Sequence, residues 1–331
     1  MSADWIAAKL GAKQNVNLKE VEGIFPVDPN IVKEQRPIEE MTYREVRESA
    51  YAGNRILQEE AMTQCRKKGI PIHVRSLSFP DSKGTRIVLE RDVTQNPVVG
   101  VTAKGKIRLY IITQEKREKF FIDLLDTFSL RGVSVDMIGT EDELVSIVID
   151  NKNINEKEED LERALSNEFK LESIITNTAL VSIVGEGIVD ALAQRKRIIQ
   201  ALDKSVTASY GPILGGAETG TTIYHIEKFG MNNETGFAMN LCSMFSEAQI
   251  PITGISTTID SISIGTNLKA SKMDIADMCN FIEERLQSDP ISVTRNGLLL
   301  HGPRRGISNI TVAIPENLLE QAVKRLYLEY F

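Results

Sequence analysis

Helical spacing followed by strand alternation characterises the first 96 residues. Apolar positions recur at helical spacing in residues 5–10 and again through residues 42–69. Residues 70–77 then alternate as a strand does, and a turn followed by a second strand is expected in residues 81–90. Because two strands are few for a free-standing α/β fold, this part of the chain is predicted to be half of such a domain.

The ends of these helices carry sequence signals. Thr42 and Glu45 have the spacing of a capping box, in which each side chain bonds the backbone N–H of the other residue. Gly11 and Gly69 are predicted C-caps, since glycine readily adopts the left-handed conformation. Gly53 is predicted to divide the longer helical region into two helices.

From about residue 97 the pattern follows the order β-α-β-β-α-β, which is the ferredoxin-like plan. The predicted elements are strand 106–113, helix 117–132, strands 133–139 and 143–150, helix 156–169 and strand 178–187. The chain therefore changes at this point from an α/β pattern to an α+β pattern.

The same order then returns, which indicates an internal duplication. The second set of predicted elements is strand 221–229, helix 234–248, strands 250–257 and 261–267, helix 272–286 and strand 297–302. Val133 corresponds to Ile250, and Val145 to Ile262, at the same offset of 117 residues. The segments after each copy, 193–216 and 307–331, are predicted to be reduced units of the same kind. The predicted domains are residues 1–96, 97–218 and 219–331.

Composition and charge exclude several classes of partner. The formal net charge is −7, with no long basic run, so we expect no nucleic-acid partner. Cys65, Cys242 and Cys279 are far apart, which argues for a reducing, cytoplasmic location and against disulfide bonds or a zinc site. No apolar run reaches the ~18 residues of a membrane span, and the N-terminus lacks the features of a signal peptide.

Residues 20–76 resemble the C-terminal part of the aspartate kinase catalytic domain. The segments "EVEGIFPVDPN", "MTYREV" and "GIPIHVRS" are similar, in the same order, to that family's Asp-Pro segment, Met-(Ser/Thr)-Tyr-x-Glu helix and Gly-Ile-Pro-Ile-x-Val-Arg strand. The order of the segments is more specific than any one of them.

The duplicated part resembles the ACT domains of aspartate kinases, which are amino-acid-sensing modules. The segments "GVSVDMI", "ALVSIVGEG" and "AVKRLYLEYF" carry this similarity, and residues 231–264 resemble the ACT domain of lysine-sensing aspartokinases. The resemblance implies a truncated amino-acid-kinase-like α/β subdomain followed by tandem ferredoxin-like βαββαβ ACT domains.

The chain departs from the family where nucleotide would be contacted. The family's glycine-rich phosphate-binding loop and its aspartate-binding segment are not found in this sequence. Phosphoryl transfer depends on positioning and charge neutralisation around the γ-phosphate, so we expect no catalytic residues, metal or cofactor here. The resemblance assigns a degenerate nucleotide-binding remnant to Lys19, Glu20, Phe25, Asn30 and Arg55.

The resemblance also implies effector sites at seams between ACT units. A loop that opens a helix presents N–H groups to a carboxylate, and an acidic side chain across the seam suits an ammonium group. In the first repeat the implied residues are Gln114, Lys116, Ser134, Asp136, Gly139, Thr140 and Glu141. In the second repeat they are Asn232, Asn233, Gly236, Phe237, Thr253, Ser256, Thr257, Thr258 and Asp260. The second set is closer to the family pattern, because Gly236 permits close approach of the backbone.

Three hypotheses remain open at this point. The first is a non-catalytic regulatory protein of aspartate-family amino-acid biosynthesis, which binds an effector of the lysine or threonine type. It would form a homodimer through its ACT domains, and residues 1–95 could dock a separate catalytic aspartokinase chain. The second is an aspartate kinase, converting ATP and L-aspartate to 4-phospho-L-aspartate only with a separately supplied N-terminal half. A third reading, ACT units that only pair sheets, has no ligand.

Overall fold

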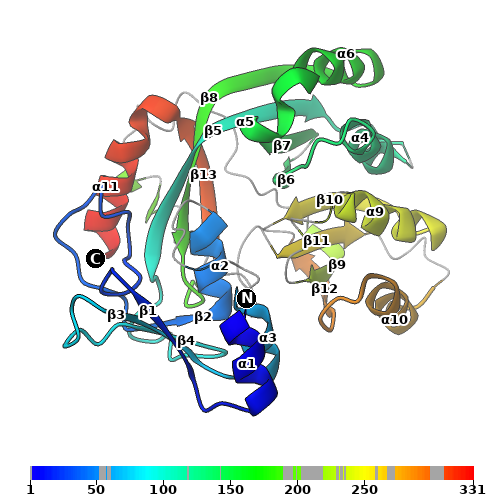
Figure 1. The fold of residues 1–331 in the computed structure, drawn as a ribbon. Helices are drawn as coiled ribbons and strands as arrows, with labels where there is room; N and C mark the ends of the chain where they lie inside the picture. Colours follow the sequence, from blue (N-terminus) through cyan, green and yellow to red (C-terminus); the bar gives the residue numbers. More distant parts are fainter. Residues whose placement is uncertain are drawn as a thin grey trace. The chain divides into compact units, whose positions relative to one another are not determined.

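The chain forms two compact units (Figure 1). Unit 1 is Met1–Gly105, Ala179–Tyr210 and Gly302–Phe331, and unit 2 is Lys106–Thr178 and Gly211–His301. The computed structural model describes residues 2–51, 57, 61–117, 119–141, 143–188, 197–198, 200–202, 219–228, 231, 234, 236–257, 260–266, 273–298 and 309–331. The domain boundaries placed after residues 96 and 218 stay predictions.

Unit 1 contains a four-stranded sheet with the order β1-β3-β4-β2. Its strands are β1 (Asn15–Lys19), β2 (Glu40–Thr42), β3 (Ile72–Ser76) and β4 (Thr85–Val88). β1 pairs with β3 in parallel, β3 with β4 antiparallel, and β4 with β2 in parallel. β3 and β4 were predicted from sequence, whereas β1 and β2 were not.

Three helices accompany this sheet: α1 (Ser2–Leu10), α2 (Tyr43–Tyr51) and α3 (Thr63–Lys68). The capping box is confirmed, because Glu45 N–H donates to Thr42 Oγ1 at 3.1 Å and Thr42 N–H donates to Glu45 Oε2 at 2.9 Å. Gly11 and Gly69 have φ values of 59° and 65°, as expected for C-caps. Gly53 lies outside the described residues.

The carboxylate of Glu45 also ties α2 to distant parts of unit 1. Arg91 donates to it through Nε at 2.7 Å and Nη2 at 2.5 Å, and the backbone N–H of Glu186 donates at 2.8 Å. The Arg91 and Glu45 side chains are 3% and 0% exposed. Such a buried pair depends on both partners, because a lone buried charge is strongly destabilising. β13 (Asn309–Pro315) and α11 (Leu319–Tyr330) complete this unit.

Unit 2 is built on a sheet with the strand order β12-β9-β11-β10-β6-β7-β5-β8. The first repeat contributes β5 (Gly100–Thr113), β6 (Met137–Glu141), β7 (Leu144–Asp150) and β8 (Leu171–Val184). The second repeat contributes β9 (Thr219–Glu227), β10 (Ile252–Thr257), β11 (Ser261–Thr266) and β12 (Ser292–Leu298). β5 and β8 each begin or end in unit 1. The predicted β-α-β-β-α-β order is confirmed in both repeats.

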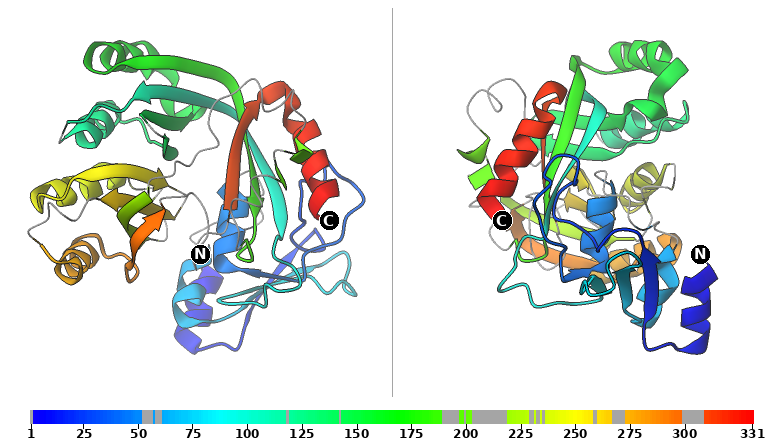
Figure 2. Two further views of the ribbon diagram at one scale, coloured as in Figure 1. Left: turned by 180° about the vertical axis from the view of Figure 1, so that it is seen from behind. Right: turned by 60° about the vertical axis from the view of Figure 1, so that its left-hand side comes forward.

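Helices cover one face of this sheet. They are α4 (Phe120–Ser129), α6 (Glu158–Glu168), α9 (Phe237–Glu247) and α10 (Ile275–Leu286), with the short helix α5 (Asn151–Ile154) after β7. Figures 1 and 2 show α6, α4, α9 and α10 on the same side of the strands. A single apolar core, with side chains from both repeats, lies between sheet and helices. In the described part of the chain, no helix is both long and apolar enough to cross a bilayer.

The duplication is visible in the packing of equivalent residues. Phe128 and Phe245, 117 residues apart, are both buried at the ends of α4 and α9. Phe128 meets Tyr110 edge-on with ring centroids 6.0 Å apart, and Phe245 meets Tyr224 edge-on at 5.2 Å. The tyrosines are 114 residues apart, because the loop between strand and helix is longer in the second repeat (228–236) than in the first (114–119).

Four predicted strand positions needed correction. β5 begins at Gly100 and β8 at Leu171, six and seven residues before their predicted starts. The second strand of the first repeat begins at Met137 rather than at residue 133. Residues 133–136 instead approach the sheet as irregular chain, in which Asp136 N–H donates to Val148 O at 2.9 Å. In the second repeat the last strand, β12, precedes the predicted segment 297–302 and overlaps only its beginning.

Candidate functional site

The two repeats meet where β6 lies beside β10. Only Gly139 and Ser256 are paired in register, and threonine hydroxyls complete the seam. Ile138 N–H donates to Thr257 Oγ1 at 2.8 Å, and Ile255 N–H donates to Thr140 Oγ1 at 3.1 Å. Both the threonines and the isoleucines are 117 residues apart. The seam is therefore pseudo-symmetric, with each repeat satisfying a buried N–H of the other.

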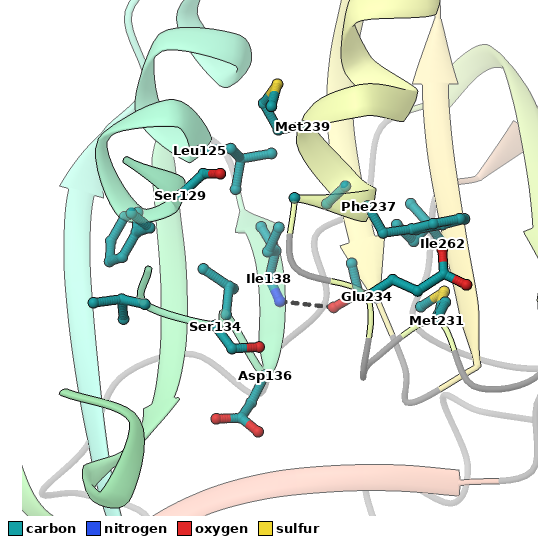
Figure 3. A pocket seen from close by; sticks show the side chains of 16 residues that line it. Leu125, Ser129, Ser134, Asp136, Ile138, Met231, Glu234, Phe237, Met239 and Ile262 are labelled. Atoms are coloured by element: carbon teal, nitrogen blue, oxygen red, sulfur yellow. Dashed lines mark hydrogen bonds between the residues drawn. The ribbon is translucent and has the colours of Figure 1, made fainter. Parts of the chain in front are cut away.

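A pocket lies on one side of this seam, with one wall from each repeat (Figure 3). The first repeat supplies the end of α4 and residues 133–138, including Ser129, Ser134 and Asp136. The second supplies Met231, Glu234 and the first turn of α9. The centres of water-sized molecules have about 60 Å³ of space inside. Both walls belong to unit 2.

The N-terminus of α9 opens at this pocket. Gly236 precedes the helix with φ 79°, a conformation that other residues adopt only with strain. A Cβ at this position would lie 3.4 Å from Ser129 Oγ of the facing wall. No side chain of the described residues caps α9, and its first turn has no acidic residue. The first N–H groups of the helix therefore present partial positive charge to the pocket.

Carboxylates stand on both walls. Asp136 Oδ2 accepts a hydrogen bond from Asp150 N–H at 2.6 Å, which orients this side chain. Glu234, across the seam, forms an ion pair with Lys228, whose Nζ lies 2.6 Å from Oε1 and 2.8 Å from Oε2. Lys228 Nζ also lies 5.3 Å from the centre of the Phe237 ring. The pocket thus combines an electropositive helix end with an acidic lining.

The structure distributes the predicted effector residues between the pocket and the seam. Ser134, Asp136, Gly236, Phe237 and Thr257 line the pocket. The remaining described positions are seam or loop residues: Gln114, Lys116, Gly139, Thr140, Glu141, Thr253, Ser256 and Asp260. Asn232, Asn233 and Thr258 lie outside the described residues. The site assignment as a whole stays a prediction.

Several of the seam residues have structural partners. Gln114 Nε2 donates to Thr253 O at 3.1 Å, which joins the first repeat's loop to β10. Asp260 O accepts from Lys228 N–H at 2.9 Å at the start of the longer loop. Lys116 is 91% exposed and lies 3.9 Å from Glu143. These contacts hold the two loops in position.

Sequence reasoning missed Glu234, Met231 and Ser129 as lining residues. The signal for Glu234 was available, since it precedes Gly236 in the same loop. Ser129 was harder to find, because it lies at the end of a helix of the other repeat. The sequence predicted sites at seams between neighbouring units but left open which units pair, whereas in the structure the two walls of this pocket come from the two repeats of one chain.

The positions assigned to a nucleotide-binding remnant lie in unit 1. Lys19 ends β1, and its carbonyl accepts from Leu77 N–H at 2.7 Å. The carbonyl of Glu20 accepts from Ser76 Oγ at 3.4 Å. Asn30 donates to Asp28 Oδ1 through its backbone at 2.8 Å and its side chain at 3.0 Å. Phe25 is half-buried, and Arg55 lies outside the described residues.

Comparison with known proteins agrees with this architecture. The model of the amino acid kinase family matches residues 1–76. Aspartokinase 3 of Bacillus subtilis (strain 168) is 27% identical over 212 residues, covering 60% of this chain and 45% of the relative. Aspartokinase 1 of the same organism is 27% identical over 234 residues, covering 67% of this chain and 55% of the relative.

Solved structures show the same fold along the chain. The aspartate kinase of Clostridium acetobutylicum, described as an allosteric enzyme, matches with a TM-score of 0.64 and 19% identity, covering 100% of this chain and 57% of that one. E. coli aspartokinase III in complex with lysine and aspartate matches with a TM-score of 0.58 and 15% identity, covering 99% and 54%.

The fold and the matched regions define an α/β protein with a kinase-related part and a duplicated ferredoxin-like part. It is aspartokinase-like in sequence and in fold. The chain spans about half the length of the curated relatives that it matches.

Proposed function

We propose that this chain is a regulatory protein that binds a free amino acid in the pocket between its two repeats. The observation that supports this function is the pairing of an uncapped helix N-terminus with carboxylates in one pocket. The α-carboxylate would lie at the first turn of α9, where N–H groups point outward. The α-ammonium would lie toward Asp136 and the Ser134 hydroxyl.

The lining favours an effector of the lysine type over one of the threonine type. Asp136 and Glu234 are both acidic and lie on opposite walls of the pocket. An acidic lining suits a ligand with a second ammonium group better than one with a hydroxyl. A related structure, E. coli aspartokinase III, was solved with lysine. The regulated process would be aspartate-family amino-acid biosynthesis.

Isothermal titration of the full chain against each proteinogenic amino acid tests this function. Lysine should release heat and bind more tightly than threonine. Asp136→Asn should weaken lysine binding by about 10- to 100-fold, since a charged hydrogen bond contributes about 1.5–3 kcal/mol. Asp160→Asn, on α6 and 62% exposed, makes the same chemical change away from the pocket and is the control. An absence of heat with every amino acid would refute the proposal.

Unit 1 favours a second component of this function, a protein partner. Large apolar side chains are exposed on α1 (Trp5 49%, Ile6 57%, Leu10 77%) and on β1 (Val16 44%, Leu18 53%). β1 ends the strand order of its sheet, so one of its edges is unpaired among the described strands. An apolar surface beside an open edge is typical of an interaction site.

The occupant we propose is the remaining part of an amino-acid-kinase domain. The family model matches this region, and the matched aspartate kinases carry further chain beyond the part that aligns. The alternative function, aspartate kinase activity converting ATP and L-aspartate to 4-phospho-L-aspartate, would arise only in such a complex. Phosphoryl transfer needs groups that gather the phosphate oxygens, and the partner would supply them.

A binding assay with the N-terminal half of Bacillus subtilis aspartokinase 3 tests this partner. Binding should be lost in the double variant Leu10→Glu, Leu18→Glu. It should be retained in Leu328→Glu, which changes an 80% exposed leucine of α11. Equal binding by both variants would contradict the docking surface. A coupled ADP-release assay on the same mixtures separates docking from catalysis, and turnover by the chain alone would contradict a regulatory role.

A further inference from the structure

A second, smaller pocket occupies the pseudo-symmetric position on the other side of the seam. It is lined by Phe121 and Ile122 of α4 and, from the second repeat, by Cys242, Ser246, Pro251 and Ile252 among others. Adding or subtracting 117 converts each of these six residues into a lining residue of the first pocket. The two pockets are therefore equivalent places in a duplicated frame. The second has about 30 Å³ for the centres of water-sized molecules, half that of the first.

Substitutions at equivalent positions fill the second pocket. Phe121, which is 5% exposed, stands where the first pocket has Ala238. Pro251 stands where the first has Ser134, which removes a hydroxyl and a backbone N–H. The position of Asp136 is taken by Thr253, so the carboxylate is lost as well. The second pocket thus has less space and fewer polar groups.

The helix end beside the second pocket is already compensated. Asp123 lies in the first turn of α4 and forms an ion pair with Arg117. Arg117 stands at the position of Glu234, and Lys119 at the position of Gly236. The Arg117 guanidinium lies 5.7 Å from the centre of the Phe120 ring and 5.4 Å from the centre of the Phe169 ring. An acidic side chain in the first turn offsets the helix dipole, so the N-terminus of α4 attracts an external carboxylate only weakly.

We propose that the tandem repeat is a self-contained receptor with a single effector site for each chain. The first pocket is open, and its pseudo-symmetric counterpart is closed by Phe121 and Pro251. This inference rests on the proposed function and adds its stoichiometry and the residues that decide it.

A second consequence follows from the origin of the walls. The two walls of the open pocket come from the two repeats of one chain, so a single chain supplies both sides of the site. If the site needed a partner chain, its apparent affinity would rise with protein concentration. A site within one chain has the same dissociation constant at every protein concentration. Effector binding then does not require a dimer. A dimer would only determine whether binding in one chain affects the other chain.

Titration with L-lysine measures the stoichiometry directly. The wild-type chain should bind one lysine per chain, with a dissociation constant that is unchanged over a 100-fold range of protein concentration. Ala238→Phe, which copies the closed pocket into the open one, should abolish the heat of binding. Phe121→Ala should leave the affinity within about two-fold, because Phe121 does not line the open pocket. Two lysines per chain, or loss of binding in Phe121→Ala, would overturn the inference.

Thiol reactivity tests the closed pocket without any amino acid. Cys242 is 1% exposed, and burial raises the pKa of its thiol to about 12. In a Cys65→Ala, Cys279→Ala background, Ellman's reagent should leave native Cys242 unreacted. Adding Phe121→Ala should make it react, whereas adding Ala238→Phe should not. Fast reaction of Cys242 with Ellman's reagent in the protein that retains Phe121 would disprove the closed pocket. If lysine gives no heat while these reactivities hold, the proposed function fails and the closed pocket stands.

Discussion

Phe121 and Lys119 begin α4 in the first repeat, and Ala238 and Gly236 hold the same places at α9 in the second. The backbone differs at the residue before each helix, with φ −105° at Lys119 and 79° at Gly236. It is similar at the other end, where a left-handed residue follows each helix: Gly132 at φ 59° in one repeat and Gln249 at φ 57° in the other. The comparison separates a frame, which both repeats keep, from the side chains that face each pocket.

The frame is held by buried groups that serve packing. Val133 N–H donates to Phe128 O at 3.0 Å, and Ile250 N–H donates to Phe245 O at 2.8 Å. These pairs position the segment that follows each helix, and this segment forms a pocket wall. A duplicated frame can therefore carry one open and one closed pocket, because the wall residues change without disturbing the core.

The largest effect that tests this comparison comes from the core aromatics. Phe128→Ala and Phe245→Ala should each lower the free energy of unfolding by about 3–5 kcal/mol, because both rings are fully buried. Urea denaturation followed by circular dichroism measures this. Leu130→Ala, at a residue 77% exposed, is the control and should change little. A loss below about 1 kcal/mol for one phenylalanine alone would show that the two frames are not equivalent.

The seam threonines should give the next largest effect. Thr140→Val and Thr257→Val keep the shape of the side chain but leave a buried N–H, of Ile255 or Ile138, without its acceptor. Each should cost about 1–3 kcal/mol, with protection of that amide from hydrogen exchange reduced. Thr102→Val is the comparison, because Thr102 is a buried threonine of β5 whose hydroxyl has no hydrogen-bond partner among the described residues. Unchanged exchange at both isoleucines would contradict the seam.

Cys242 should make the free energy of unfolding depend on pH in the alkaline range, whereas its counterpart Leu125 carries no titratable group. The folded protein holds the Cys242 pKa near 12, above the ordinary value of 9.0, because burial disfavours the thiolate. The unfolded chain releases this proton above pH 9, so stability falls as pH rises from 9 toward 12, by about 1.4 kcal/mol per unit. Urea titrations at pH 8, 9 and 10 should show a steeper fall in wild type than in Cys242→Ala. Equal slopes would contradict the assignment.

Gly236 should give the smallest effect on stability and a clear effect on binding. Gly236→Ala should cost about 1 kcal/mol, because its φ of 79° strains any residue with a Cβ. The added methyl would contact Ser129 Oγ and narrow the pocket. Steric crowding costs about 1 kcal/mol or more, so lysine binding should weaken by about 10-fold. Lys119→Ala is the matched change in the first repeat. A similar loss of binding there would mean that both helix ends take part.

Much of the fold could be predicted because it depends on local signals. The capping box of Thr42 and Glu45 needs only two side chains three residues apart. The helix of α4 and that of α9 follow from apolar positions on one face. The offset of 117 residues identified both repeats, since each repeats its order of elements. These signals are carried by short segments, so no long-range contact was needed to read them.

The short strands of unit 1 could not be predicted in this way. β1 and β2 are 5 and 3 residues long, and their partners, β3 and β4, lie far along the chain. An exposed edge such as Val16 and Leu18 lacks the buried face that specifies a strand. Their pairing is visible only after the chain has folded.

The sequence by itself determined the elements, their duplication and the residue types that could hold a zwitterion, because periodicity and turn chemistry are local. It also contained the exchange of Ala238 for Phe121 at equivalent positions. Only the tertiary structure decided that α9 faces residues 133–138 of the other repeat and that Thr140 and Thr257 are committed to the seam. Those facts depend on how β6 and β10 lie side by side, and strand pairing across more than 100 residues leaves no local pattern in the chain.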